Sequence, residues 1–142
     1  MKRILVIGAI LVVVIAIQFV PVDRGAAAAL SVEAPAQVMD VIETSCADCH
    51  SGATRWPWYG RVAPISWIVA HHVAEGREHV DFSRWQDVDA GRRSHWLEEI
   101  VEVIETGEMP PGYYTAMHGD ADLDVRSREL LLRWARDGAS GH

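Results

Sequence analysis

The sequence predicts an all-α domain, and three observations carry that prediction. Apolar residues recur at helical spacing in three segments, near residues 38–42, 97–104 and 130–135. No run of alternating β-branched residues is available to supply strands. A five-residue motif, Cys46-Ala47-Asp48-Cys49-His50, contains the only two cysteines of the 142-residue chain. We expect the helices to gather around this motif.

Length and charge limit the function classes. A chain of 142 residues has room for one domain of about 100 residues and a leader. The 20 acidic side chains outnumber the 13 basic ones, so the formal net charge is −7. We therefore expect no nucleic-acid partner. A protein partner would more naturally present a basic patch, because complementary charge steers association.

The amino-terminal segment, residues 1–24, predicts a membrane anchor. Residues 4–22 are uncharged and follow Lys2 and Arg3. As a helix they would span about 29 Å, close to the hydrocarbon thickness of a bilayer. This length predicts one transmembrane helix in the inner membrane of a bacterium, with the rest of the chain facing the periplasm. The alternative is a signal peptide cleaved near Ala26–Ala29, which would leave a soluble periplasmic protein. Residues 25–35, rich in Ala with Gly and Pro, predict a tether to the domain at 36–138.

The C-x-x-C-H motif predicts one covalently attached haem c. Two thiols at this spacing add across the vinyl groups of a porphyrin, and the adjacent imidazole reaches the iron. Cys46 and Cys49 would hold the haem, and His50 would be the proximal iron ligand. Bacteria attach c-type haem outside the cytoplasmic membrane, which agrees with the predicted export.

The two cysteines allow three other interpretations. A redox-active C-x-x-C needs a βαβ context that this chain lacks. A structural zinc site needs a second pair of ligands at ribbon or finger spacing. A structural disulfide is compatible with an oxidising compartment but leaves His50 without a role.

The next predicted elements surround the motif. Residues 36–45 read as a helix that places Cys46 and Cys49 on nearly the same face. The aromatic and proline residues of 54–67 predict rigid walls on one side of the haem, with Trp56 and Trp67 among them. The carbonyl of Pro64 is a candidate acceptor for the free ring nitrogen of His50, or the proline only stiffens the loop.

A helix is expected over residues 67–76, ended by Gly76. Arg77 follows it, either as a partner for a haem propionate or as a solvated surface residue. Ser83 is a candidate helix N-cap.

Two longer helices follow. An amphipathic helix with an acidic outer face is expected to end near Gly107. Asp124 is expected to cap a last helix that ends at Gly138. The acidic face is most simply solvated, and it is also the best candidate for a docking surface.

The second iron ligand is predicted to be Met109. Two prolines follow it in the loop between the last two helices, so its thioether can be held in a fixed position. A thioether on the iron face opposite His50 favours the reduced iron. The competing candidates are Met117, His118, His71 and His72.

The order of these parts resembles single-haem class I cytochromes c. A closer resemblance covers residues 41–135 and rests on the strings CADCHS, TRWPWYGRVAPISW, HHVAEGR, FSRW and GEMPPGYY. These strings together are similar to the small bacterial haem-binding domain proteins, which typically carry a membrane-anchored leader. The resemblance implies covalent haem c and a cytochrome c-like helical fold around one haem.

These predictions lead to one function and one alternative. An iron with two protein ligands has no open position for a substrate, so we expect one-electron transfer with a redox partner protein and no enzyme activity of its own. The alternative is a haem peroxidase or a gas or redox sensor with an open distal site. It would need a nearby acid–base group such as His118, His71 or His72.

Overall fold

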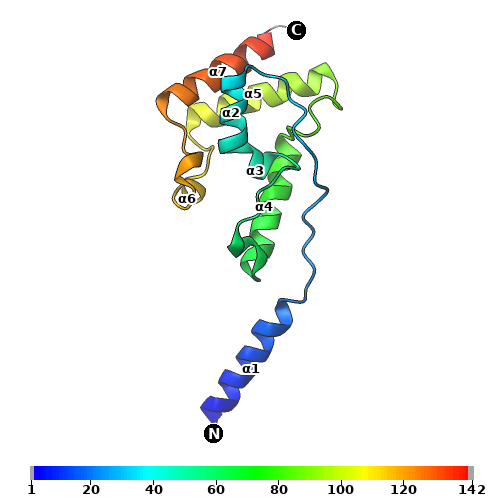
Figure 1. Cartoon of the computed structure of the whole chain (residues 1–142), viewed down its shortest axis with the longest axis vertical. Helices are drawn as coiled ribbons and strands as arrows, with labels where there is room; N and C mark the ends of the chain where they lie inside the picture. Colours follow the sequence, from blue (N-terminus) through cyan, green and yellow to red (C-terminus); the bar gives the residue numbers. More distant parts are fainter. Residues whose placement is uncertain (1, 141–142) are drawn as a thin grey trace.

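The computed structural model describes residues 2–140, and every regular element in that range is helical (Figure 1). The predicted all-α class is therefore confirmed, while the first residue of the predicted anchor lies outside the described range. In chain order the elements are α1 (Lys2–Ile17), α2 (Ala36–Val41), the π-turn η1 (Ile42–Cys46), α3 (Ala47–His50), the 3-10 turn η2 (Trp58–Arg61), α4 (Ile65–His79), α5 (Ala90–Thr106), α6 (Gly112–Thr115), the 3-10 turn η3 (Gly119–Ala121) and α7 (Val125–Ser140).

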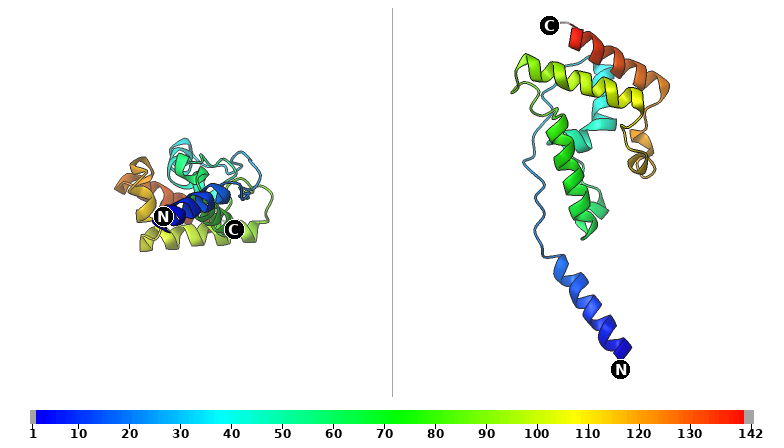
Figure 2. Two further views of the ribbon diagram at one scale, coloured as in Figure 1. Left: turned by 90° about the horizontal axis from the view of Figure 1, so that it is seen from below. Right: turned by 180° about the vertical axis from the view of Figure 1, so that it is seen from behind.

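The core lies where α2, α5 and α7 meet. Helices α5 and α7 pack along each other, and α2 lies against α7 (Figure 2). The predicted apolar stripes face inward, since Ile100 and Ile104 of α5 and Leu131 and Ala135 of α7 are buried. Ile42, which follows α2, is fully buried among them. The helical periodicity of the sequence therefore located the main core.

Of the three glycines predicted to end helices, one does so and two lie inside helices. Gly107 ends α5, with a left-handed φ of 75°. Helix α4 instead runs through Gly76 to His79, and α7 runs through Gly138 to Ser140. A Cβ atom at Gly76 would lie 2.9 Å from the carbonyl oxygen of Cys49, and one at Gly138 would lie 2.8 Å from Cδ1 of Leu97. Both predicted endings are wrong, because these glycines allow close approach of a neighbouring element.

The predicted cap at Asp124 is confirmed, and the one at Ser83 is wrong. Asp124 accepts a hydrogen bond of 2.7 Å from the backbone N–H of Ser127 at the start of α7. No helix begins at Ser83; its hydroxyl accepts from the Gly52 N–H at 2.8 Å and donates to the Ala28 carbonyl at 3.2 Å. Ser83 therefore joins the segment before the motif to the loop after it.

The amino-terminal helix is shorter than predicted. Helix α1 has 16 residues and ends at Ile17, so the expected continuous helix over 4–22 is wrong. Turns replace the helix at residues 18–20, because Pro21 disfavours helical backbone in the residue before it. Among residues 2–140, no helix combines the length and apolar character needed to cross a membrane.

The segment predicted as a tether packs on the domain. The Ala28 N–H donates to the Gly52 carbonyl at 3.2 Å, and the Ser31 N–H donates to the Phe82 carbonyl at 2.9 Å. Val32 is buried in the main core. Residues 28–34 are thus part of the folded domain, which begins before the predicted boundary at residue 36.

Candidate functional site

The C-x-x-C-H motif lies at the end of a helical run over residues 36–50. The π-turn η1 interrupts this run and ends on Cys46, the first residue of the motif, as such turns often do at functional sites. Helix α3 ends at Ser51, where the backbone becomes extended. The buried hydroxyl of Ser51 donates to the Ala47 carbonyl at 2.6 Å. The Cys46 and Cys49 side chains are free and partly exposed. Both cysteines therefore lie on one short turn, with their side chains largely shielded from water.

His50 is held by the far end of α4. Its Nδ1 lies 3.1 Å from the carbonyl oxygen of Val80, which follows α4 directly. The ring also meets the edge of Phe82, with 6.5 Å between centroids. Since Nδ1 donates to a carbonyl, Nε2 carries the free lone pair. Burial lowers the pKa of His50, so the imidazole is neutral near neutral pH.

Pro64 does not take the role predicted for it. Its carbonyl accepts from the Trp67 N–H at 3.1 Å in the first turn of α4. The acceptor for His50 comes from the opposite end of the same helix. That end reaches the motif because α3 and α4 pack together and Gly76 lies against Cys49.

Arg77 stabilises the loop after the motif. Its Nε donates to the Ser51 carbonyl at 2.8 Å, Nη1 to the Arg24 carbonyl at 3.1 Å, and Nη2 to the Thr54 hydroxyl at 2.9 Å. All three nitrogens thus have protein acceptors, and we assign Arg77 to this loop instead of to a propionate.

Trp56 and Trp67 do not lie together. The guanidinium of Arg24 covers the half-buried Trp56 ring at 5.2 Å from its centroid. Trp67 lies on α4 and is exposed. Trp56 therefore packs with the amino-terminal segment, and the role of both rings as haem walls stays a prediction.

Met109 and His118 are the two partly buried candidates for the second ligand, whereas Met117, His71 and His72 are exposed. Met109 is partly buried against the main core, and its N–H donates to the Val103 carbonyl at 3.2 Å. Met117 is 63 % exposed. Nε2 of His118 lies 2.7 Å from the Tyr59 hydroxyl, and Nε2 of His71 lies 3.3 Å from Glu75. His72 is exposed beside Tyr113.

A polar cluster that the sequence did not predict joins α6 to the motif. The Tyr114 hydroxyl donates to Oδ2 of Asp48 at 2.9 Å, and Arg55 donates to both oxygens of that carboxylate. The Tyr114 ring stacks on His118 at 4.4 Å, and His118 in turn meets Tyr59. Burial, followed by the Asp48 charge, raises the pKa of Tyr114. The segment after Met109 is thereby held on α3 and η2, and no sequence pattern identifies such long-range pairs.

The protonation of the thiols argues against a redox-active C-x-x-C. Burial raises the pKa of Cys46 to about 12 and that of Cys49 to about 11. A redox-active C-x-x-C depends on a lowered thiol pKa, so this environment is the opposite of the required one. Within residues 2–140 no group of three metal-binding side chains is placed to hold a metal ion. The residues instead fit a haem, with two thiols on one turn next to a neutral imidazole whose Nε2 is free.

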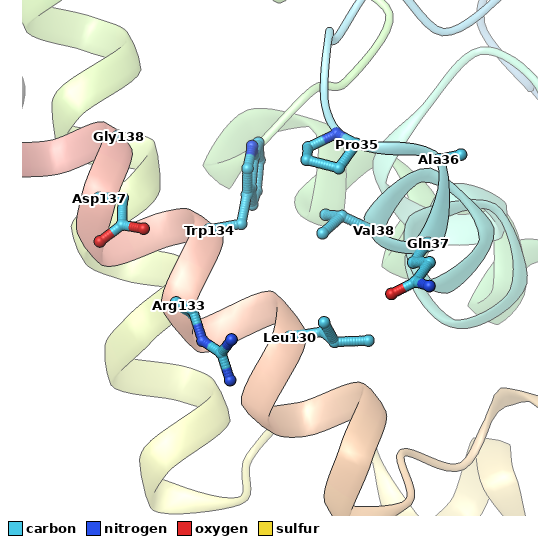
Figure 3. A pocket seen from close by; sticks show the side chains of 9 residues that line it. All are labelled: Pro35, Ala36, Gln37, Val38, Leu130, Arg133, Trp134, Asp137 and Gly138. Carbon is cyan, nitrogen blue, oxygen red and sulfur yellow. The ribbon is translucent and has the colours of Figure 1, made fainter.

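A separate groove of about 360 Å³ lies between α2 and α7. Figure 3 shows Leu130 and Trp134 of α7 facing Pro35 and Val38 across it. None of the candidate site residues lines this groove. It is therefore not part of the site around the motif.

The fold and the motif together define the class. An all-helical domain that presents two thiols and a neutral imidazole on one turn belongs with the haem-binding helical proteins. The family model described as a haem-binding domain matches residues 12–137, and the chain belongs to this family. Haem is therefore its cofactor. Neither the curated proteins nor the solved structures gave a significant match to this chain.

Proposed function

We propose that the protein binds one haem c covalently and transfers single electrons to and from a redox partner protein. Cys46 and Cys49 would form the thioether bonds, and His50 and Met109 would bind the iron. The observation that carries this proposal is the hydrogen bond between Nδ1 of His50 and the Val80 carbonyl, which leaves Nε2 free beside the two thiols. Haem iron supplies the one-electron chemistry by changing between its ferric and ferrous states.

The protein residues contribute orientation and a fixed environment. The Val80 carbonyl sets the tautomer of His50 and increases its basicity as a ligand. Asp48 and Tyr114 hold the segment that follows Met109, which would keep its thioether in a fixed position. If His50 and Met109 both bind the iron, no position would be left on it for a substrate. The protein is accordingly proposed to be an electron carrier and not an enzyme.

The acidic face of α5 is the proposed docking surface for the partner. Glu98, Glu102 and Glu105 are exposed along this helix. A partner with a basic patch would be steered toward this face, and the association would weaken as salt is added.

We further propose that the domain is exported to the outer side of a bacterial cytoplasmic membrane. Covalent haem is attached there, and α1 is apolar with no buried residue. A helix that is apolar on all sides needs an apolar environment, so we propose that α1 associates with lipid.

The first experiment is an absorption spectrum of the protein expressed with the c-type maturation machinery, with a pyridine haemochrome of the same sample. A c-type haemochrome and the far-red band of methionine-ligated ferric iron are expected. Met109→Ala should abolish that band, whereas Met117→Ala, at an exposed methionine in the same region, should keep it. An unchanged ferric spectrum in Met109→Ala would show that another residue is the ligand. Failure to find covalent haem would overturn the c-type attachment.

One observation favours the alternative, an open distal site. His118 and Tyr59 form a polar pair in contact with Tyr114, and such a pair could serve as an acid–base group for peroxide or as a hydrogen-bond donor to a bound gas. Rapid and complete binding of carbon monoxide by the ferrous protein would favour this alternative. Slow or incomplete binding would favour electron transfer.

A further inference from the structure

The acidic residues are unevenly distributed along the chain. Residues 1–22 and 49–74 contain no Asp or Glu, although the chain has 20 of them. The charged side chains of these two stretches are all basic, namely Lys2, Arg3, Arg55 and Arg61. The whole negative charge therefore lies in the other parts of the sequence.

The fold brings these two stretches together. At the end of α1, the Gln18 side chain donates to the Ala63 carbonyl at 3.1 Å and accepts from the Ala63 N–H at 2.9 Å. Arg24 donates to the Gly60 carbonyl at 3.2 Å. Figure 1 and the right-hand view of Figure 2 show α1 ending beside the end of α4 that carries η2. This end of the domain, residues 58–68, therefore lies next to the apolar helix α1.

The 58–68 end exposes large apolar side chains. Trp58 is 78 % exposed and Ile68 is 50 % exposed. Three further apolar residues of the same end are also exposed: Val62, Ile65 and Trp67. Exposed apolar side chains gathered at one end of a domain indicate a surface that is covered in the working protein.

We infer that the 58–68 end lies against the surface of a lipid bilayer beside α1; this inference rests on the proposed association of α1 with lipid. Tryptophan favours the membrane–water interface, where its ring is apolar and its N–H stays hydrated. Arg61 can extend toward lipid phosphates while its stem covers apolar surface. The absence of acidic residues from 49–74 removes repulsion from anionic headgroups. A second copy packed through the same 58–68 end would cover the apolar residues, but that end has no acidic residue to pair with Arg61.

The test uses the haem-loaded full chain on vesicles of phosphatidylethanolamine and phosphatidylglycerol. The vesicles contain a phospholipid with a photoactivatable diazirine near its headgroup, and lipid adducts are mapped by mass spectrometry of peptides. Adducts are expected in α1 and in 58–68, at least about fivefold above the level in the peptide around Val125. Val125 is a suitable control because it is apolar and 75 % exposed, yet lies at the start of α7. Adducts in α1 alone would overturn this inference and leave the association of α1 standing, whereas adducts in neither would overturn both.

A second measurement distinguishes lipid from a second copy of the chain. Ile68→Cys and Val125→Cys each replace an exposed side chain, and each new thiol is reacted with a water-soluble maleimide on vesicles. The rate at position 68 should fall about tenfold relative to the rate after denaturation, and the rate at position 125 should not. This protection should be the same when the protein is diluted in excess lipid. Equal rates at the two positions, or protection that disappears on dilution in lipid, would overturn the inference.

Discussion

Gly76→Ala tests the contact between α4 and the motif. In an unobstructed helix this substitution is stabilising, by about 1 kcal/mol, because alanine loses less backbone entropy than glycine. Here the new Cβ would lie 2.9 Å from the Cys49 carbonyl oxygen and 3.3 Å from its carbon. Both are backbone atoms, so no side-chain rotation relieves the contact. Overpacking of this kind costs about 1–3 kcal/mol. The net expectation is a loss of about 0–2 kcal/mol in the free energy of unfolding, instead of a gain of about 1 kcal/mol.

The same substitution should change the haem. Moving α4 away from the motif lengthens the hydrogen bond between His50 and Val80, and a weaker bond makes the imidazole a poorer donor to ferric iron. A loss of about 0.5–1 kcal/mol in that bond corresponds to a rise of about 20–40 mV in the one-electron reduction potential. The assays are guanidinium denaturation followed by far-UV circular dichroism and potentiometric titration of the haem.

Gly112→Ala is the matched control, because a Cβ atom at Gly112 meets nothing within 4 Å. This variant should be as stable as the parent or slightly more so, with an unchanged potential. If Gly76→Ala were also more stable and kept the parent potential, α4 would not press on Cys49 in the haem-loaded protein. The end of α4 would then not hold Val80 against His50 in the way that the hydrogen bond indicates.

Three further predictions concern the rest of the site and one helix cap. Tyr114→Phe removes the hydrogen bond to Asp48 and should lower the free energy of unfolding by about 1–2 kcal/mol, whereas Tyr113→Phe, at the exposed neighbouring tyrosine, should have no effect in the same denaturation assay. In the haem-free folded protein, the raised pKa values of both thiols should slow alkylation at pH 8 by about 100-fold relative to the denatured chain, and equal rates would contradict the burial of the motif. The hydrogen bond from the Ser127 N–H lowers the pKa of Asp124 in the folded protein. The stabilising effect of this cap should therefore be present above the ordinary carboxyl pKa, and it should be lost as the pH falls through the pKa of Asp124 in the folded protein. The stability difference between the parent and Asp124→Ala should therefore be larger at pH 6 than at pH 3, and a constant difference would refute this.

Local chemistry made haem binding predictable, and the family model supports it. Two thiols and an imidazole within five residues have the spacing of a haem attachment motif, so Cys46, Cys49 and His50 are proposed as its ligands from spacing alone. The core of α5 and α7 was predictable for a similar reason, since helical periodicity reports which side of a helix is buried. The partners of these residues were not predictable in the same way. Val80 meets His50 only because of the angle at which α4 crosses α3, and no pattern within either segment encodes that angle.

The glycines show why a correct local pattern can lead to a wrong element. A glycine after an apolar stretch predicts a helix end because it adopts a left-handed backbone readily, and Gly107 does so. The same lack of a Cβ atom also lets another backbone approach a helix closely, as at Gly76. The two cases look identical in sequence and differ only in what lies beside the residue. Arg77, the next residue, donates hydrogen bonds to Ser51 and Thr54 beside the motif. Gly76 therefore marks the place where α4 contacts the turn that carries the motif. Variants that enlarge residue 76 should alter the haem before they unfold the helix.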